Sequence, residues 1–523
     1  MVGGTSRRNF LKGLALATVA RAAGAQSAMP DKQTRPNLLF VFADQLRLQS
    51  CGYAGDAKAH TPNMDRLAAQ GVSFANAVSS TPVCSAFRAS LLTGKYTTTT
   101  GMVINELRLS PDHECFGHVL TRAGYQTGYI GKWHLWANQL GHHDEVRNAF
   151  VPPGPYRLGF DGYWAAYNFH HIYHNAYYFR DEPKKIAYGG PEVYEPDAQT
   201  DLAIAFLEGA ARSPRPFALF LSYGTPHDPW TWANAPRKES ALFRKARLPN
   251  PPNYSPRNDP YADAWAVFRR GERQRLETWR RVYYAMTANL DANLGRLLTA
   301  LDRLGLRRNT IVVFTSDHGE MFGAHGRRAK NIFYEEAIRI PFVIRWPGAI
   351  PAGLATNACL STPDIMPTLL SLMGLPIPRK VEGTDLSHLA LGKQGPEPEA
   401  AFLQGTGTTA AWRDGHEWRA VRDKRFTYAV YRRDRAELLF DNNNDPWQMK
   451  NLVGEKKYAD ELERLRGLLR QKMAELNDTF EACTWYRDHW TSNRNILRGA
   501  RGGTHDLDLL AGILRRYFPE ARP

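Results

Sequence analysis

Three uninterrupted apolar segments constrain the fold of this chain more than any other feature of its sequence. They cover residues 37–43 (NLLFVFA), 216–223 (PFALFLSY) and 310–315 (TIVVFT). A strand buried on both faces has this continuous pattern, whereas a strand with one wet face alternates apolar and polar residues. Segments with helical periodicity separate them. The alternation from residue 36 to about 375 predicts a three-layer α/β sandwich built on a large, mostly parallel sheet.

The pattern changes after about residue 395. Short segments at 418–422, 426–431 and 437–440 have the character of antiparallel strands, and an amphipathic helix follows over 456–476. These elements predict a smaller α+β subdomain with a short antiparallel sheet. We therefore expect a large α/β domain over 31–390, followed by a subdomain and tail over 391–523; a chain of 523 residues is long enough for both.

The N-terminus has the character of a targeting segment. Residues 6–12 (SRRNFLK) resemble a twin-arginine export signal, and an apolar stretch over 13–20 leads to small residues at 23–25. That stretch is too short to span a bilayer. We predict that residues 1–30 are a signal peptide read by the twin-arginine machinery. The protein is then periplasmic or secreted and has no stable membrane anchor.

Charge and cysteine content narrow the function classes. The formal net charge is +15, which is consistent either with an ordinary well-charged surface or with a field that attracts anionic substrates. The sequence has no P-loop, zinc-finger spacing or RNP-type motif, so a nucleic-acid partner is not expected. Four of the five cysteines, Cys51, Cys115, Cys359 and Cys483, lie outside any motif. They could form two disulfides or remain four buried thiols.

The fifth cysteine lies in the segment 82–96 (PVCSAFRASLLTGKY). Pro82 and the small residues predict a turn into a helix, and Gly94 suits its C-terminal cap. Cys84 is then in the first turn, where free backbone N–H groups favour anions, and Arg88 lies on the same face one turn later. By itself such a pair is more often a buried thiol beside a surface arginine.

Polar side chains follow the predicted strands at the ends where an α/β sheet binds its ligands. They are Asp44, Gln45, Lys132, His134, His227, Asp317 and His318, and a loop adds Lys330. The first two and Asp317 offer oxygen ligands for a hard divalent cation, which His318 could complete. The lysines and Arg88 suit a tetrahedral oxyanion, and the other two histidines can move protons near neutral pH. Each residue alone is more often structural, so the inference depends on the whole set.

The region from about 140 to 195 combines histidines with many aromatic residues. The histidines are His142, His143, His170, His171 and His174. We weigh two interpretations: loops that form a substrate wall, in which His170, His171 and His174 contact the substrate, or ordinary loop packing.

Together the motifs resemble the type I sulfatases of the alkaline-phosphatase superfamily, over about 36–475. Residues 84–88 (CSAFR) with 92–95 (LTGK) are similar to the signature whose cysteine is oxidised to formylglycine. Further similar segments are 131–135 (GKWHL), 225–227 (TPH), 316–320 (SDHGE), Lys330 with 334–336 (YEE), and 438–452 with its LLFD, DP and NL elements. The resemblance implies an alkaline-phosphatase-like fold and a sulfuric ester hydrolase, and we expect its sulfated substrate to be a carbohydrate.

The resemblance also implies site roles and cofactors. Cys84 becomes formylglycine through a maturation enzyme, and it joins Asp44, Gln45, Asp317 and His318 around a calcium ion. Three positions depart from the commonest family pattern. Ala86 replaces proline, and this Cys-x-Ala-x-Arg form is linked to a different maturation enzyme. Gln45 replaces an aspartate and His318 an asparagine; this set suits calcium and leaves magnesium and manganese as alternatives.

The mechanism implied by the resemblance is covalent catalysis. One hydroxyl of the hydrated aldehyde attacks sulfur, and the second later expels sulfate. Asp317 is the candidate base for the attack, while Arg88, Lys132, Lys330 and the metal hold and neutralise the transferring group. His227, helped by Lys330, protonates the leaving alcohol, and His134 deprotonates the second hydroxyl. The alternatives are a phosphonate monoester hydrolase or phosphodiesterase of the same superfamily, and a non-catalytic carbohydrate-binding relative.

Overall fold

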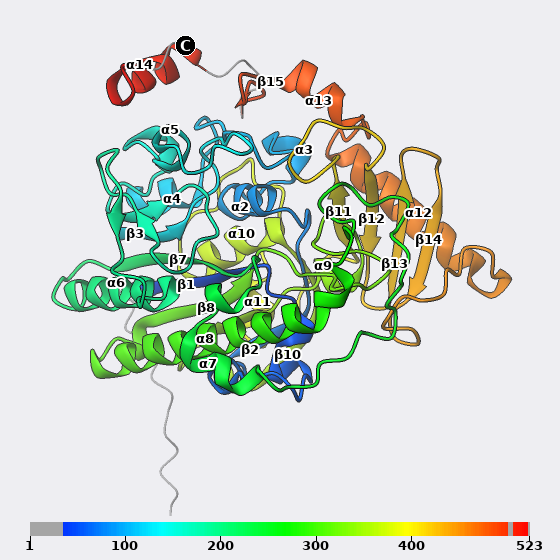
Figure 1. The fold of residues 1–523 in the computed structure, drawn as a ribbon, viewed down its shortest axis with the longest axis horizontal. Helices are drawn as coiled ribbons and strands as arrows, with labels where there is room; N and C mark the ends of the chain where they lie inside the picture. The colour runs from blue at the N-terminus through cyan, green and yellow to red at the C-terminus, as the bar shows by residue number, and fades with distance from the viewer. Residues whose placement is uncertain (1–34, 500–505, 521–523) are drawn as a thin grey trace, which may run out of the picture.

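The computed structural model describes residues 35–499 and 506–520. The predicted signal peptide lies outside the described residues. One eight-stranded sheet organises the large domain, with strand order β10-β2-β9-β8-β1-β7-β3-β4 (Figure 1). In chain order its strands are β1 (Asn37–Asp44), β2 (Val72–Val78), β3 (Gln126–Lys132), β4 (Tyr163–Tyr167), β7 (Phe217–Pro226), β8 (Thr310–Ser316), β9 (Phe342–Arg345) and β10 (Leu354–Ser361). All neighbours pair in parallel except at β9, which is antiparallel to β8 and β2.

The three uninterrupted apolar segments form the centre of this sheet. β1 lies between β7 and β8, and all its residues are buried. Phe40 pairs with Phe220 on one side and with Val313 on the other. A central parallel strand has no wet face, so the continuous pattern correctly predicted these three strands.

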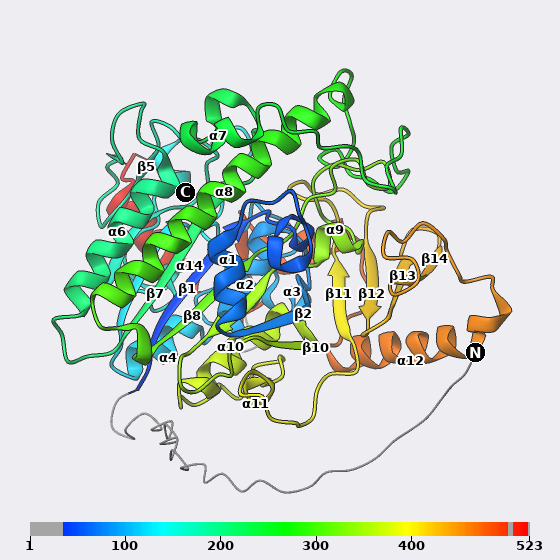
Figure 2. The same cartoon turned by 90° about the horizontal axis from the view of Figure 1, so that it is seen from below.

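Helices cover both faces of the sheet (Figure 2). Leu38, Phe40 and Phe42 of β1 pack into one core with α2 (Cys84–Thr93), α4 (Phe116–Arg122) and α10 (Thr362–Leu372). Leu39 and Val41 pack into a second core with α1 (Pro62–Ala69), α6 (Glu195–Ala210) and α8 (Leu276–Arg303). Successive side chains of a strand point to opposite faces, so one strand supplies both cores. The predicted three-layer α/β architecture is confirmed.

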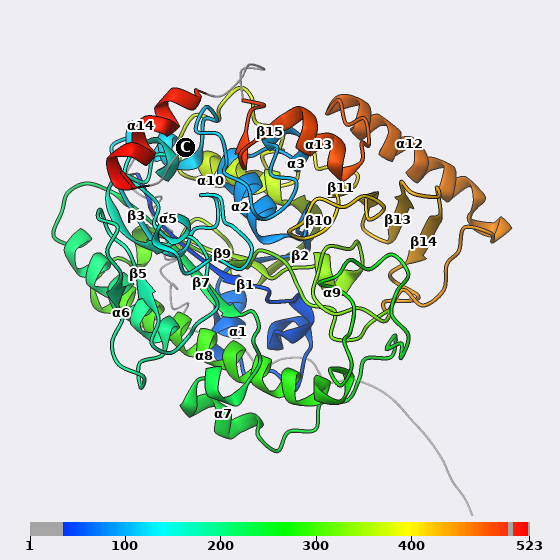
Figure 3. The same cartoon turned by 45° about the horizontal axis from the view of Figure 1, so that its top comes forward.

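The small antiparallel sheet is confirmed as well. Its order is β11-β12-β13-β14, formed by Ala401–Gly405, Trp418–Arg422, Phe426–Tyr431 and Glu437–Asp441. Leu462, Leu465 and Leu469 of α12 (Ala459–Glu475) pack against it. Beyond it, α13 (Cys483–Trp490), the short strands β15 (Thr491–Ser492) and β16 (Asn495–Ile496), and α14 (Leu507–Tyr517) return along the large domain (Figure 3).

Two further sequence-based questions are answered by the structure. All five cysteines are buried free thiols, so the two-disulfide alternative is wrong. Within 35–499 and 506–520, no helix combines the length and the apolar character needed to cross a membrane.

Candidate active site

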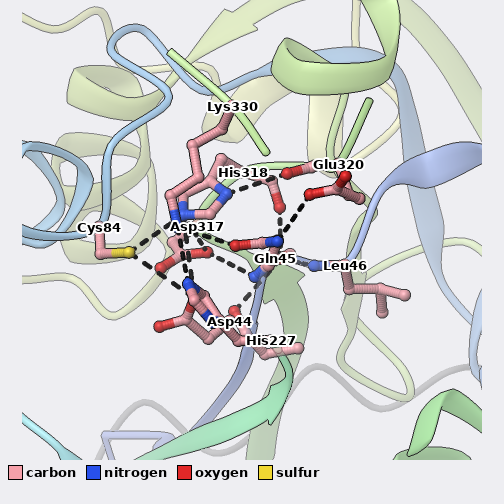
Figure 4. A network of polar contacts seen from close by, with 12 residues as sticks. Asp44, Gln45, Leu46, Cys84, His227, Asp317, His318, Glu320 and Lys330 are labelled. Carbon is pink, nitrogen blue, oxygen red and sulfur yellow. Dashed lines mark hydrogen bonds and ion pairs between the residues drawn. The ribbon is translucent and has the colours of Figure 1, made fainter. Parts of the chain in front are cut away.

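The polar residues predicted at strand ends meet at the C-terminal edge of the large sheet (Figure 4). β1 ends at Asp44, β3 ends at Lys132, and His227 and Asp317 directly follow β7 and β8. Because β1, β3, β7 and β8 are parallel neighbours, their carboxyl ends are brought together. The side chains of these four residues are nearly or fully buried.

Cys84 begins α2, as predicted, and points into this group of residues. Its Sγ lies 3.2 Å from His318 Nε2 and 3.7 Å from Asp44 Oδ1. Burial alone would raise the pKa of the thiol, but Lys132, Lys330 and His318 lower it well below its usual value. The residue at position 84 therefore lies where negative charge is stabilised.

Arg88 is held in place from several elements. Its Nη1 donates to the Lys132 carbonyl at 2.6 Å and to Ser222 Oγ at 2.7 Å. Its Nη2 contacts Asp44 Oδ2 at 3.1 Å and Asp317 Oδ2 at 3.4 Å. The guanidinium therefore ties α2 to three strands and to the residue that follows β8, and the alternative of a surface arginine is excluded because the residue is buried.

Asp44 carries an asymmetric set of contacts. Lys132 Nζ lies 2.5 Å from Oδ2, the same oxygen that Arg88 contacts, whereas Oδ1 faces Cys84 and His318. Burial opposes ionisation, yet Lys132 and Arg88 contribute to a pKa for Asp44 well below its usual range. One oxygen is neutralised by cations, and the other remains available as a ligand.

The donor atoms beside Cys84 fit a divalent cation. Asp44, Cys84, Asp317 and His318 each offer one ligand atom, and these atoms all lie within 4.8 Å of one another. His318 Nδ1 lies 3.1 Å from the Gly319 carbonyl oxygen, which accepts its hydrogen and leaves the Nε2 lone pair facing the carboxylates. His318 Nε2 is 3.5 Å from Asp317 Oδ1 and 3.8 Å from Asp44 Oδ1. Such a convergence of lone pairs favours a bound cation.

Gln45 differs from the other predicted ligands. Its Oε1 accepts from Lys330 Nζ at 2.8 Å, and its Nε2 donates to Glu320 Oε2 at 2.7 Å. Both ends of the amide are therefore engaged by protein. Gln45 orients Lys330 in this arrangement, and its role as a metal ligand stays a prediction.

The remaining predicted residues line a pocket of about 240 Å³ that opens above Cys84. His134, His227 and Lys330 belong to its wall. Burial is the main cause that lowers the pKa of His134 to about 3, and this neutral ring lies beside Cys84. Lys330 Nζ is 2.7 Å from His227 Nε2. The pocket thus brings a proton acceptor and a possible proton donor to one nucleophile-sized side chain.

Strained backbone is present at four positions in or beside the site. Gln45 and His134 have φ values of 70° and 55°, and Ala329 and Asn331, which flank Lys330, have 61° and 65°. Non-glycine residues adopt this left-handed region at a cost, and such residues cluster at functional sites. Next to Lys132, Gly131 has a φ of 95°, and a Cβ atom there would lie 2.0 Å from the Ser222 carbonyl oxygen. Close approach of β3 and β7 therefore requires glycine.

The two interpretations of the histidine-rich loops, a substrate wall and ordinary loop packing, each apply to some of the histidines. His171 lines the pocket, and its Nε2 lies 3.3 Å from Lys132 Nζ; His143 also belongs to the wall. His170 is instead buried against the ring of Tyr167, with its Nε2 near the Tyr177 carbonyl. His174 contacts the backbone carbonyls of Pro191 and Ala235. The structure does not bring His170 and His174 to the pocket, and loop packing accounts for both.

The charged residues of the site that were not predicted include Glu320, Asp228 and Arg328. Buried Glu320 accepts from Gln45 and from the backbone N–H groups of Phe322 and Ala329. Asp228 and Arg328 form part of the pocket wall. Asp228 directly follows His227, and Arg328 lies two residues before Lys330. This proximity in the sequence was the only available signal for these two residues, because the contact between them arises from tertiary packing.

Comparisons with known proteins agree with this geometry. The family model Sulfatase matches residues 36–375, and the model N-sulphoglucosamine sulphohydrolase, C-terminal, matches residues 323–477. The ulvan-active sulfatase of Formosa agariphila is 38% identical over 475 residues, which cover 90% of this chain and 86% of the relative. The N-acetylglucosamine-6-O-sulfatase of Bacteroides thetaiotaomicron is 29% identical, with 87% and 89% covered.

Solved structures extend the similarity to three dimensions. The structure of BT4656 in complex with its substrate D-glucosamine-2-N,6-O-disulfate superposes with a TM-score of 0.73 at 26% identity, over 85% of this chain and 99% of that one. The phosphonate monoester hydrolase of Silicibacter pomeroyi, at 24% identity and a TM-score of 0.68, shares the fold. The chain belongs to the sulfatase family of the alkaline-phosphatase superfamily and is a sulfuric ester hydrolase.

Proposed function

We propose that this enzyme hydrolyses sulfate esters of a sulfated carbohydrate through a formylglycine residue made from Cys84. The observation that carries the proposal is the position of Cys84 at the start of α2, between the lone pairs of Asp44 and His318 and the ammonium groups of Lys132 and Lys330. The named substrates of the relatives, ulvan and sulfated glucosamine, support a carbohydrate.

We propose that Asp44, Asp317 and His318 hold a divalent cation, with calcium as the first candidate and magnesium or manganese as alternatives. A bound cation would polarise a sulfate oxygen and lower the charge that develops on it. The nitrogen donor of His318 makes the set less purely oxygen-based than calcium usually takes, so reconstitution with each metal decides its identity.

The cations of the site have separate tasks in this proposal. Lys132 and Arg88 neutralise one oxygen of Asp44 and stabilise negative charge beside residue 84. Asp317, whose pKa is raised by burial and by the nearby Asp44, accepts the proton of the attacking hydroxyl. His134, neutral at physiological pH, accepts a proton from the second hydroxyl when sulfate leaves.

The alcohol that leaves when the S–O bond breaks requires a proton source. Lys330 Nζ and His227 Nε2 lie 2.7 Å apart, so a hydrogen bond joins them and one proton can pass to the leaving oxygen from this pair. Asn105, Glu106, His143, Phe169 and Trp265 also line the pocket. Aromatic and polar side chains together suit a sugar ring.

The proposal extends to targeting and processing. Residues 1–30 are proposed as a twin-arginine signal that delivers the folded enzyme to the periplasm or the medium. Residues 31–390 are the proposed catalytic domain and 391–523 the C-terminal subdomain and tail. Ala86 follows Cys84 by two residues and is buried, so a maturation enzyme that tolerates alanine is the proposed partner, acting before the site closes.

The test compares a sulfate ester and a phosphate ester of one aglycone, followed by defined sulfated mono- and disaccharides, with matured protein. We expect kcat/KM to be highest for a sulfated sugar. Faster hydrolysis of a phosphonate or phosphate diester would favour the phosphonate hydrolase alternative. Binding of sulfated sugars without turnover would favour the non-catalytic relative.

A further inference from the structure

The two ring nitrogens of His227 have different surroundings. Nδ1 lies 2.8 Å from Asp228 Oδ1 and 3.1 Å from the backbone carbonyl oxygen of Asp228. Neither oxygen has a hydrogen to give at neutral pH, so Nδ1 must carry one. Nε2 lies on the other side of the ring, 2.7 Å from Lys330 Nζ. The contact with Asp228 therefore fixes which nitrogen is turned toward Lys330.

Asp228 is itself held by charged neighbours. Its Oδ2 lies 3.7 Å from Arg328 Nη2, and Arg328 Nη1 donates to Glu272 Oε1 at 2.8 Å. The Arg328 guanidinium also lies over the Trp279 ring, 5.0 Å from its centroid. A row of alternating charges, Glu272, Arg328 and Asp228, thus leads to His227, and its last two members line the pocket.

The geometry points to Asp228, held by Arg328, as a positioning residue for proton transfer to the leaving alcohol. This inference rests on the proposed sulfate ester hydrolysis. The carboxylate fixes the ring so that Nε2 and Lys330 Nζ face the leaving oxygen, and it stabilises positive charge on the imidazole. Its role resembles that of any carboxylate that orients a catalytic histidine through Nδ1.

Cleavage of the sulfate ester is coupled to proton transfer from the His227–Lys330 pair. The bond from the nucleophile oxygen to sulfur forms, and the bond from sulfur to the sugar oxygen breaks with its electron pair on that oxygen. The proton shared by Nε2 and Nζ moves to the sugar oxygen and gives the alcohol. Asp317 takes the proton of the attacking hydroxyl, and this proton equivalent later returns to the pair through solvent. Asp228 keeps its negative charge throughout.

Charge balance around the ring agrees with this assignment. Burial and Lys330 lower the pKa of His227, but Asp228 and Asp44 outweigh them and raise it to about 9. The pKa of Asp228 is lowered, although burial opposes this, because His227 and Arg328 stabilise the carboxylate. Asp228 therefore stabilises the positive charge that His227 and Lys330 share through this hydrogen bond.

If Asp228 positions the proton donor, the reaction rate in its variants should depend on the basicity of the leaving group. A sugar alkoxide is strongly basic and needs a proton as the S–O bond breaks, whereas 4-nitrophenolate is a weak base and leaves without one. Loss of proton transfer should therefore affect a sugar sulfate far more than 4-nitrophenyl sulfate. A residue that serves only the fold would affect both substrates equally.

The experiment measures kcat and KM of wild type, Asp228→Asn and Asp228→Glu on both esters. Asp228→Asn keeps the size of the side chain and an oxygen acceptor for Nδ1–H, so it removes mainly charge. We expect kcat on the sugar sulfate to fall about 10²-fold, and that on 4-nitrophenyl sulfate by no more than about threefold, with KM nearly constant. Asp228→Glu should recover part of the loss.

Controls separate folding from chemistry. Arg328→Gln leaves Asp228 in place without its cationic partner and should show the same substrate dependence with a smaller loss. Asp302→Asn, at a half-exposed ion pair with Arg307, should leave both rates unchanged. Thermal unfolding of each variant verifies the fold.

Equal losses on both esters, or no loss on either in Asp228→Asn and Arg328→Gln alike, would overturn the assignment. A matured wild type that hydrolyses neither ester would instead contradict the proposed function itself, and this inference with it.

Discussion

Two buried groups of charged residues can be compared directly in this molecule. One is the active site, where Asp44 and Asp317 meet Arg88, Lys132 and Lys330. The other is a pair of ion pairs in and beside the small sheet, Arg419–Asp478 and Arg422–Glu335. All of these side chains are nearly or fully inaccessible to solvent.

The ion pairs of the small sheet are saturated. Arg419 Nε and Nη2 contact the two oxygens of Asp478 at 2.5 and 2.8 Å, and its Nη1 donates to the Gly405 carbonyl. Arg422 contacts the two oxygens of Glu335 at 2.7 and 3.0 Å. Each carboxylate is thus bound by one guanidinium in a bidentate arrangement, and Glu335 also contacts Arg339 at 3.3 Å.

The active site is arranged differently. Two cations contact the same oxygen of Asp44, and its other oxygen faces a thiol and a histidine nitrogen. The comparison teaches that buried charge alone does not mark a functional site. The active site differs in having ligand atoms that are not neutralised by the charged side chains around them.

The largest expected effect is the loss of activity in Cys84→Ala. This variant removes the nucleophile, so we expect sulfate release to fall at least about 10⁴-fold, with a thermal midpoint close to that of wild type. Cys359→Ala, which removes a buried thiol remote from the pocket, should keep its activity. Substantial turnover in Cys84→Ala would remove the distinction between the two regions.

The opposite outcome is expected at the small sheet. Asp478→Asn leaves the Arg419 charge buried without its carboxylate, which should lower the free energy of unfolding by about 3–5 kcal/mol. The folded fraction should retain the kcat of wild type. Denaturant titration and initial rates check both statements; a normal stability combined with a low kcat would reverse the roles of the two regions.

Removal of the metal should affect only the active site, and its expected effect on the free energy of unfolding is smaller. A chelator should abolish activity, and restoration by calcium, magnesium or manganese in turn identifies the ion. If the ion is present at about 100 times its Kd, its removal should cost about 2.7 kcal/mol of stability. The same treatment should leave the stability loss of Asp478→Asn unchanged. Full activity after exhaustive chelation would contradict a metal role for Asp44, Asp317 and His318.

The smallest effect is a pH dependence of the saturated pairs. Burial would raise the pKa of Glu335 and Asp478, but Arg422 and Arg419 lower both below the ordinary values of 4.5 and 3.8. Stability from a lowered carboxyl pKa is present above the ordinary value and is lost as pH falls through the folded-state pKa. The stability difference between wild type and Arg419→Met/Asp478→Leu should therefore stay flat from pH 8 to 5 and decrease below about pH 4. A slope between pH 8 and 5 would contradict this assignment.

The sequence predicted the elements with the strongest periodicity and missed the weaker ones. β1, β7 and β8 are continuous apolar segments, so both their type and their position were clear. β2 and β10 were missed because they include polar and exposed or half-buried residues, and β4 and β11 were missed because each spans only five residues. The segment 338–345 (IRIPFVIR) predicts one strand, but Glu335–Ile338 forms the helix α9 and the strand β9 begins only at Phe342.

The sequence predicts more of the active site than of the loops around it. The topology of a parallel sheet alone brings Asp44, Lys132, His227 and Asp317 together, so their positions at strand ends sufficed. The partners of these residues could not be found in this way. Asp228 and Arg328 meet only because two distant loops fold onto each other, and His170 faces Tyr167 rather than the pocket for the same kind of reason.

The central claim is that position 84 carries a modified nucleophile in a site built for sulfate ester hydrolysis. The most direct measurement is the mass of the peptide containing residue 84, from protein produced in a host that exports and matures it, together with the rate of sulfate release from the same sample. We predict an aldehyde or its hydrate in place of the thiol, with activity proportional to the modified fraction. Full activity in a sample whose Cys84 is entirely a free thiol would contradict the account.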